Sequence, residues 1–387
     1  MLNFYIKIVI FALYWPCPKT PFQKGHVRGE ALQKTIKDLA TIITYLRRVL
    51  CLVVVVCSVW GCQQAKPAYI KVEGQMLGTF LTVSARTSHS SAEVYDLMMR
   101  IDKQAKASMS IFEEGSLLSR LNSNETDLLD EHILYCLNLS RRVSEQSGGV
   151  YDVTVGPLVE AYGFAAKDRQ AKVNVDSLLE FVGIDKLQVV DGRLQKADSR
   201  MKIDFNSIAK GYVVDMAARA LEELGIEDYL VDIGGEVRCR GVNAKGGAWR
   251  IGIETPFDGN NSMGEFVQQV ISLTDSSMAT SGNYRRYYLD DQGQKISHTI
   301  DPRTGRSAVT SLLSATVIAP TCAEADAYGT MFMAMGLEQA LSTAKMLEGE
   351  GVQVYFIAAG KDDEYEIYYS RSLADALATV DGYRVIE

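Results

Sequence analysis

Residues 202–235 read KIDFNSIAKGYVVDMAARALEELGIEDYLVDIGG, and this stretch contains the elements that decide the fold. Its start, Lys202–Phe205, predicts a short strand. Ser207–Leu224 carries apolar side chains at helical spacing and stops at a glycine, which predicts an amphipathic helix. Tyr229–Ile233 is apolar and partly β-branched, so a second strand is expected to follow and to break at Gly234-Gly235.

The rest of the chain contains further helices and strands that do not alternate regularly. Helical periodicity recurs in Ala92–Ser108, Ile133–Ser147, Ala323–Met335 and Leu337–Leu347. Strand patterns occur in Tyr69–Ala85 (two strands and a turn), Trp249–Glu254, Glu265–Leu273, Tyr287–Asp290, Leu312–Ile318 and Val352–Ala358. Strands clustered between pairs of helices favour an α+β fold over a doubly wound parallel sheet. With no linker after residue 69, residues 69–387 are expected to form a single domain.

Composition and charge narrow the range of possible functions. The chain has 387 residues, of which 47% are hydrophobic and 23% charged, as in ordinary globular proteins. Its net charge is −8, but residues 1–62 carry +6, so the remainder carries −14. An acidic body argues against non-specific nucleic-acid binding, which depends on Lys and Arg. If this body binds a phosphorylated ligand, a metal cation is expected to supply positive charge.

The common motifs of catalysis are missing from the sequence. It contains no P-loop, no Gly-x-Gly-x-x-Gly after a strand, no His-Glu-x-x-His and no Gly-x-Ser-x-Gly. It also lacks a Cys-x-x-Cys pair, which excludes a zinc ribbon or a thioredoxin-like motif.

The N-terminal region predicts export. Arg47-Arg48 precede the apolar run Val49–Trp60, which has the length of a signal-peptide core and is followed by Gly61-Cys62. This pattern resembles a bacterial lipobox, so we expect a signal peptide over 47–61, a lipid on Cys62, a tether over 62–68 and a protein anchored to a membrane in the periplasm. A simple membrane anchor or an uncleaved segment is the alternative. Residues 1–46 precede the apparent signal and are interpreted as an extension upstream of the true translation start.

Asp326 and Thr330 form a candidate metal site. Because they lie four residues apart in a predicted helix, their side chains share one face, about 5–6 Å apart. A carboxylate and a hydroxyl are hard oxygen ligands of the kind that Mg²⁺ prefers. In the alternative interpretation, Asp326 caps the start of the helix.

The stretch from Asp204 to Lys210 is a candidate phosphate site. A strand runs into a helix here, so free backbone N–H groups could meet a phosphate, and Lys210 adds a positive charge. Asp204 could accept a hydrogen bond from a ribose or a flavin. Alternatively, Asp204 or Asn206 caps the helix and Lys210 is solvated.

His298 precedes a turn. The sequence Asp301-Pro-Arg-Thr-Gly305 has Pro and Gly at turn positions, which would hold His298 and Thr299 at the rim of a loop. A lone histidine is more often a packed or surface residue than a catalytic one. The Gly234-Gly235 pair is interpreted as a tight turn with no chemistry of its own.

Eight segments, taken together and in order, resemble the ApbE family of FAD:protein FMN transferases between about Tyr69 and Ala358. They are Met76–Thr79, Met109-Ser110 with Ser119–Asn122, Tyr151–Pro157, Asp204–Tyr212, Val231–Gly235, Ala279–Tyr284, His298–Gly305, and Ala325-Asp326 with Thr330. The resemblance implies a single T-fold-like domain of mixed and antiparallel sheets with packed helices.

The resemblance also implies a set of site residues. Mg²⁺ would be bound by Asp326, Thr330 and the main-chain carbonyl of Ser207, while Gly329 stands where some members carry an acidic residue. The positions that match FAD contacts are Met76, Phe112 (frequently Tyr in the family), Val150, Tyr151, Asp152, Asp204, Lys210 and Ile300. His298 is the candidate general base, with Asp301 as its orienting partner or its rival.

The family reaction is a Mg²⁺-dependent phosphoryl transfer. A Thr or Ser hydroxyl of an acceptor flavoprotein attacks the FMN-side phosphorus of FAD, and AMP leaves. The resemblance implies acceptors in membrane redox complexes such as the sodium-pumping quinone reductase or the Rnf complex. Two alternatives remain at this point: an FAD pyrophosphatase that yields FMN and AMP, and a flavin-binding lipoprotein without enzymatic activity.

Overall fold

The computed structural model describes residues 36–50, 67–165, 174–258, 260, 265–284, 286–361, 364–379 and 381–386. The chain divides into two units, residues 1–64 and 65–387. In the first unit, residues 36–50 are helical. Most of the predicted signal segment, including Cys62, lies outside the described residues. Among the helices in the described ranges, none combines the length and the apolar character needed to cross a membrane.

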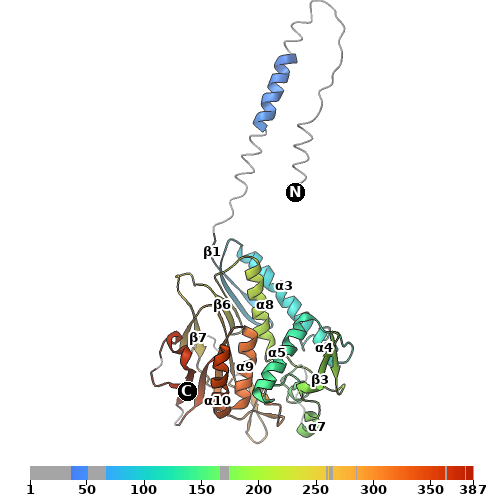
Figure 1. The fold of residues 1–387 in the computed structure, drawn as a ribbon, viewed down its shortest axis with the longest axis vertical. Helices are drawn as coiled ribbons and strands as arrows, with labels where there is room; N and C mark the ends of the chain where they lie inside the picture. Colours follow the sequence, from blue (N-terminus) through green and yellow to red (C-terminus); the bar gives the residue numbers. More distant parts are fainter. Residues whose placement is uncertain are drawn as a thin grey trace, which may run out of the picture. The chain divides into compact units, whose positions relative to one another are not determined.

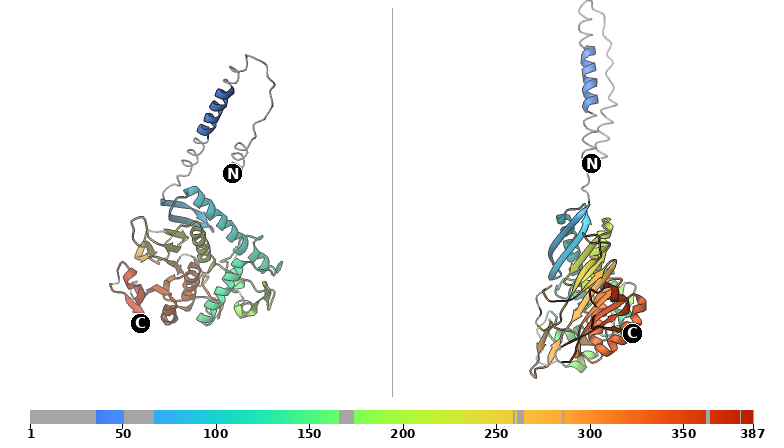
Figure 2. Two further views of the ribbon diagram at one scale, coloured as in Figure 1. Left: turned by 45° about the horizontal axis from the view of Figure 1, so that its top comes forward. Right: turned by 90° about the vertical axis from the view of Figure 1, so that its left-hand side faces the viewer.

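The second unit is built on a sheet of nine strands among the described residues, in the order β1-β2-β5-β6-β9-β14-β15-β16-β17. The pairs are antiparallel except for β16 and β17. Figure 2 shows the strands crossing the domain from β1, in blue, to the red strands near the C-terminus. The strands are β1 (Ala68–Met76), β2 (Thr79–Thr87), β5 (Tyr229–Ile233), β6 (Glu236–Arg240), β9 (Ser276–Gly282), β14 (Leu312–Ala319), β15 (Gln353–Ala359), β16 (Tyr365–Ser370) and β17 (Arg384–Ile386).

Helices cover one face of this sheet (Figure 1). The described helices are α3 (Ser91–Met109), α4 (Leu117–Asn122), α5 (Glu131–Ser147), α6 (Gly156–Ala161), α7 (Val175–Leu179), α8 (Ala209–Glu223), α9 (Cys322–Met335) and α10 (Leu337–Leu347), with 3₁₀ turns at Ile184–Lys186, Glu348–Glu350 and Arg371–Ala376. Strand side chains such as Val231, Ala279 and Phe356 point to this face and pack with the helices in one apolar core. Alternation along the strands sends their neighbours to the other face.

A hairpin covers part of the opposite face. It consists of β7 (Trp249–Glu254) and β8 (Val267–Leu273), which pair antiparallel. Trp249 and Ile271 of the hairpin pack with Met278 and Tyr355 of the sheet in a second core. The described residues also form three small antiparallel pairs: β3 (Leu187–Val190) with β4 (Arg193–Lys196), β10 (Tyr287–Leu289) with β11 (Lys295–Ser297), and β12 (Ile300–Asp301) with β13 (Arg306–Ser307).

Helices α8 and α9 approach each other closely at Gly211. A Cβ atom at this position would lie 2.2 Å from the carbonyl oxygen of Cys322, so only glycine fits without a shift. Four residues along α8, the buried Asp215 accepts hydrogen bonds from the N–H groups of Cys322 and Ala323 and pairs with Arg238. These contacts hold the start of α9 against α8.

Most of the predicted elements are confirmed, but Lys202–Phe205 is not a strand. It makes one isolated bridge, between Lys202 and Val155, and the side chain of Asn122 bonds both the N–H and the carbonyl of Ile203. The expectation was wrong because a side chain from elsewhere satisfies the backbone that a strand partner would pair.

Candidate functional site

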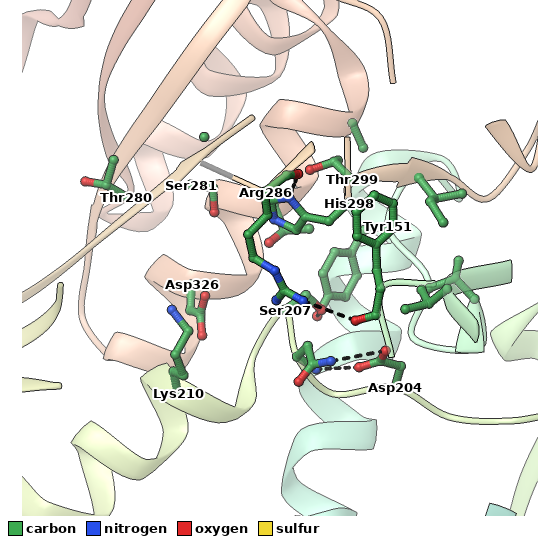
Figure 3. Close-up of a pocket in the computed structure, with 18 of the residues that line it drawn as sticks. Tyr151, Asp204, Ser207, Lys210, Thr280, Ser281, Arg286, His298, Thr299 and Asp326 are labelled. Atoms are coloured by element: carbon green, nitrogen blue, oxygen red, sulfur yellow. Dashed lines mark hydrogen bonds between the residues drawn. The ribbon is translucent and has the colours of Figure 1, made fainter. Parts of the chain in front are cut away.

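A cavity of about 280 Å³ opens where α8 and α9 meet the ends of β6 and β9. Figure 3 shows Lys210 and Asp326 pointing into one space, with Tyr151, Arg286 and His298 across from them. The lining residues are Val150, Tyr151, Asp152, Val155, Val159, Phe164, Asp204, Asn206, Ser207, Lys210, Gly234, Glu236, Thr280, Ser281, Gly282, Tyr284, Arg286, His298, Thr299, Ile300, Asp326, Thr330 and Ala334.

Three charged side chains from three different elements meet in this cavity. Lys210 of α8 forms an ion pair with Oε1 of Glu236 at the start of β6, and Asp326 of α9 interacts electrostatically with both. Burial raises the pKa of Glu236 to about 7, and burial also raises the pKa of Asp326, although Lys210 opposes both shifts. Burial alone would lower the pKa of Lys210, but the two carboxylates raise it. The cluster carries one positive charge for two carboxylates and so favours an added cation.

Glu236 leaves one carboxylate oxygen without a partner. Its side chain is 4% exposed, and Oε2 has no hydrogen bond within the described structure. Burying a carboxylate oxygen unpaired is costly, so such an atom in a cavity wall is suited to a ligand.

The donor set around Asp326 fits Mg²⁺. Asp326 and Thr330 lie on the same face of α9, as their spacing predicts, and Ser207 lines the same cavity. In a regular helix the N–H of Gly211 would donate to the carbonyl of Ser207, four residues earlier, but here it donates to Asp326 Oδ2 at 3.0 Å. The regular hydrogen bonds of α8 begin with the N–H of the next residue, so no main-chain donor in the described structure reaches the Ser207 carbonyl. No three His, Cys, Asp or Glu side chains converge within the described ranges, so hydroxyl and carbonyl oxygens have to complete the site.

Neither capping alternative is confirmed. The N-cap of α9 is Thr321, which forms a capping box with Glu324, so Asp326 is free for another role. Helix α8 has no side-chain cap. Asp204 instead accepts hydrogen bonds from the backbone and side-chain nitrogens of Asn206, at 2.8 and 3.3 Å, and burial raises the pKa of Asp204.

Tyr151 and Asp152 line the cavity but are already partnered. The Tyr151 hydroxyl lies 2.9 Å from Oγ of Ser207. The Asp152 carboxylate accepts hydrogen bonds from the N–H and hydroxyl of Thr154 and from the N–H of Ile184. Asp152 therefore shapes the cavity wall through its backbone turn, while its carboxylate is occupied.

His298 is one of the side chains that line the cavity. Its Nδ1 is 3.2 Å from the main-chain oxygen of Arg286, and its ring packs edge-on against Phe164 with centroids 6.3 Å apart. Because a carbonyl only accepts, Nδ1 carries the proton and Nε2 is left as an acceptor. Burial, together with the charges of Arg286 and Lys210, lowers the pKa of His298 to about 4, so the imidazole is neutral near pH 7.

Three predicted site residues do not line the cavity. Asp301 has no bond to His298: both of its carboxylate oxygens accept from Arg303, at 2.9–3.0 Å, so the expectation that it orients His298 is wrong. Met76 is 1% exposed and packs in the core between the sheet and the helices. Phe112 is 58% exposed in the turn after α3, where its N–H donates to the Ser110 hydroxyl.

Comparison with known proteins identifies the family of the chain. A model of the ApbE family matches residues 77–356. The FAD:protein FMN transferase of Escherichia coli (strain K12) is 33% identical over 326 residues, which cover 78% of this chain and 90% of the relative. That of Vibrio cholerae serotype O1 is 35% identical over 329 residues, covering 82% and 95%. The chain belongs to the ApbE family.

Solved structures of the ApbE family share the fold. The flavin transferase ApbE from Vibrio cholerae superimposes with a TM-score of 0.70 at 31% identity, covering 80% of this chain and 99% of that one. The Pseudomonas stutzeri flavinyl transferase ApbE, in its apo form, gives a TM-score of 0.71 at 26% identity, covering 81% and 98%. The predicted α+β architecture with a single ApbE-like domain is confirmed.

In this member of the ApbE family, Gly329 packs directly against the sheet. A Cβ atom at position 329 would lie 2.9 Å from Oγ of Ser281, so a larger side chain would need Ser281 to move. The oxygen that an acidic residue would supply at this point is therefore missing, whereas Glu236 lines the same cavity with one carboxylate oxygen that has no partner within the described structure.

Sequence reasoning about the ApbE-like motifs missed several lining residues. Glu236 directly follows the glycine turn, which was interpreted as having no chemistry, and the hairpin of β5 and β6 carries it back to Lys210. Phe164, Tyr284 and Arg286 also line the cavity. Tyr284 is the last residue of the recognised segment Ala279–Tyr284, Glu236 and Arg286 follow a recognised segment within two residues, and Phe164 follows one by seven residues. Proximity to a recognised segment was the signal that could have found them.

Proposed function

We propose that the chain transfers FMN from FAD to a threonine or serine hydroxyl of an acceptor protein, with Mg²⁺ bound and AMP as the leaving group. The observation that carries this proposal is the cluster of Lys210, Glu236 and Asp326 in one cavity with Ser207 and Thr330. The names of the family relatives support the donor and the transferred group. A diphosphate adds negative charge to a cluster that already has an excess of carboxylate, which explains the need for a dication.

Different residues of the chain would bind the metal, the phosphates and the flavin ring. Ser207, through its carbonyl, Asp326 and Thr330 would hold Mg²⁺, which when bound neutralises charge on the phosphate oxygens. Lys210 lines the cavity with about 38% of its side chain exposed, so its ammonium group can move from Glu236 to a phosphate. Val150, Ile300 and the apolar side chains beside them offer a surface for the flavin ring, and Asp204 offers a hydrogen-bond acceptor.

His298 is proposed as the general base. The acceptor hydroxyl oxygen forms a bond to the FMN-side phosphorus, the bond from that phosphorus to the bridging oxygen breaks, and that oxygen leaves with AMP. The hydroxyl proton passes to Nε2 of His298, which is neutral and free to accept it. Most of the acceleration would come from positioning and from charge neutralisation in the cavity.

The test is a transfer assay with the purified protein, FAD and a soluble flavin-accepting domain of a sodium-pumping quinone reductase. We expect AMP release and a mass increase of one FMN on a Thr or Ser of that domain, both abolished by EDTA and restored by Mg²⁺. AMP and free FMN without acceptor modification would indicate a pyrophosphatase. Intact FAD in all samples would indicate flavin binding without catalysis.

We also propose that the mature protein is exported and anchored in the periplasm through a lipid on Cys62, where the exposed domains of quinone reductase or Rnf complexes would be its acceptors. The support is the arginine pair, the apolar run and the Gly-Cys sequence at the N-terminus. Mass spectrometry of the protein from membranes should show an acylated Cys62 as the first residue, and Cys62→Ala should release it from the membrane. An unmodified Cys62 would contradict the proposal.

A further inference from the structure

A second, larger cavity lies on the sheet face that the helices do not cover. Its volume is about 800 Å³, and it runs between strands β1, β2, β5, β6 and β9 and the β7–β8 hairpin. Its floor consists of side chains that share one face, because they pair across neighbouring strands: Thr82 with Asp232, Asp232 with Val237, and Val237 with Met278. This groove is separate from the helix face, to which Glu236 points.

Strand β7 forms one wall of the groove. Arg250, Ile251 and Gly252 of this strand all line it. Within the described residues, β7 pairs only with β8. Its outer edge therefore presents N–H and carbonyl groups to which an extended polypeptide can add as a further strand.

The groove meets the cavity of Lys210 and Asp326 at the end of the sheet. Gly234, Thr280 and Tyr284 line both cavities. The turn after β5 has no side chain at Gly234 or Gly235, and both residues have positive φ, of 70° and 100°. Thr79 packs against Gly234, but a Cβ atom at Gly235 would have no neighbour within 4 Å, so the backbone is open at this residue. A chain lying in the groove can pass over Gly235 toward the other cavity.

We infer that this groove binds the segment of the acceptor protein that carries the threonine or serine to be modified, as an extended strand along β7. The inference rests on the proposed transferase function, since a hydroxyl that belongs to a protein must be carried into the cavity by its own backbone. The polar floor at Thr82, Asp232 and Thr280 suits a polar segment, and Val267, which is 44% exposed, offers an apolar contact at the hairpin.

The test compares groove variants with a matched control. In Thr82→Trp and Val267→Trp, an indole fills the groove, whereas Met346→Trp places it at a position of α10 that is 67% exposed and lines neither cavity. For transfer to the flavin-accepting domain, kcat/KM should fall at least tenfold in each groove variant. The FAD affinity, measured by flavin fluorescence, should be unchanged, and Met346→Trp should resemble the wild type. Equal transfer by all variants would overturn the inference.

A crosslink covers the case in which the groove variants fold poorly. A photoreactive benzoylphenylalanine at position 82 should capture the acceptor domain within a few residues of its modified Thr or Ser, and the same group at position 346 should not. Capture from position 346 alone would overturn the inference. If the wild-type protein transfers no FMN at all, the proposed function fails instead, so the two failures are distinguishable.

Discussion

Two clusters of buried charge span the same three elements, α8, β6 and α9, and differ in how completely they are paired. In the first cluster, Asp215 accepts hydrogen bonds from Arg238 and from two N–H groups at the start of α9. In the second, one turn earlier on α8, Lys210 pairs with Glu236, whose other carboxylate oxygen has no partner. A paired cluster holds a scaffold together, whereas an incompletely paired one costs stability unless a ligand completes it. The comparison separates the structural charges from those available for chemistry.

The largest effect is expected at Asp326. Asp326→Asn keeps an acceptor for the Gly211 N–H but removes the charge, so transfer and AMP release should fall about a thousandfold, the equivalent of roughly 4 kcal/mol. The free energy of unfolding should stay within about 1 kcal/mol of the wild type, because the variant relieves repulsion with Glu236. AMP assays and urea unfolding measure the two quantities. An active Asp326→Asn protein would refute the metal assignment.

The opposite result is expected at Asp215. Asp215→Ala leaves the Arg238 guanidinium without its partner and two N–H groups without an acceptor, so the free energy of unfolding should fall by about 3–5 kcal/mol. Urea unfolding monitored by circular dichroism checks this. The double variant Asp215→Ala/Arg238→Met should recover part of the loss, since it removes the unpaired charge. A loss below about 1 kcal/mol would show that the two clusters do not differ in the way described.

A change at Glu236 should weaken metal binding without abolishing it. Glu236→Gln retains the shape of the side chain but weakens the attraction for a cation, so Mg²⁺ should bind about tenfold more weakly, as is typical for residues that support a metal site. Isothermal titration calorimetry with Mg²⁺ measures this, with the exposed Glu338→Gln on α10 as the control. Equal Mg²⁺ affinities in the two variants would exclude Glu236 from the metal site.

The smallest effect concerns pH. The pKa of Glu236 is raised to about 7 in the folded protein, from an ordinary value of 4.5, so the folded state binds more protons than the unfolded state between these values. Stability of the metal-free protein should therefore fall as the pH rises from about 5 to 7, by on the order of 1 kcal/mol. Glu236→Gln should flatten that slope in urea unfolding at several pH values. If the slope of stability against pH is the same in Glu236→Gln, another carboxyl group causes it.

Local patterns were sufficient for elements whose stability depends on their own residues. The helix periodicity of Ala92–Ser108 and Ile133–Ser147 predicted α3 and α5 to within two residues at each end, because their apolar spacing and caps are local. Strand β9, Ser276–Gly282, was missed although it is central in the sheet. Its small and polar residues show no apolar alternation, and its place depends on β6 and β14 on either side.

In the candidate site, too, some features were predictable from local sequence and others were not. Ser207, Lys210, Asp326 and Thr330 were predicted from motifs, and all four line one cavity. The pairing of Asp301 was predicted incorrectly, because the nearby Arg303 competes for its carboxylate, and sequence spacing does not reveal which partner wins.

By itself, the sequence determined the family, the five longest helices of the domain, eight of the seventeen described strands, the acidic character of the domain and the residue types suited to a dication and a diphosphate. Only the tertiary structure decided that Glu236 lies beside Lys210, that the Ser207 carbonyl lacks a main-chain donor, and that a groove adjoins the cavity. The physical reason is that periodicity and turn chemistry act over a few residues, whereas the pairing of charge joins segments farther apart, 26 residues for Lys210 and Glu236 and 115 for Gly211 and Asp326.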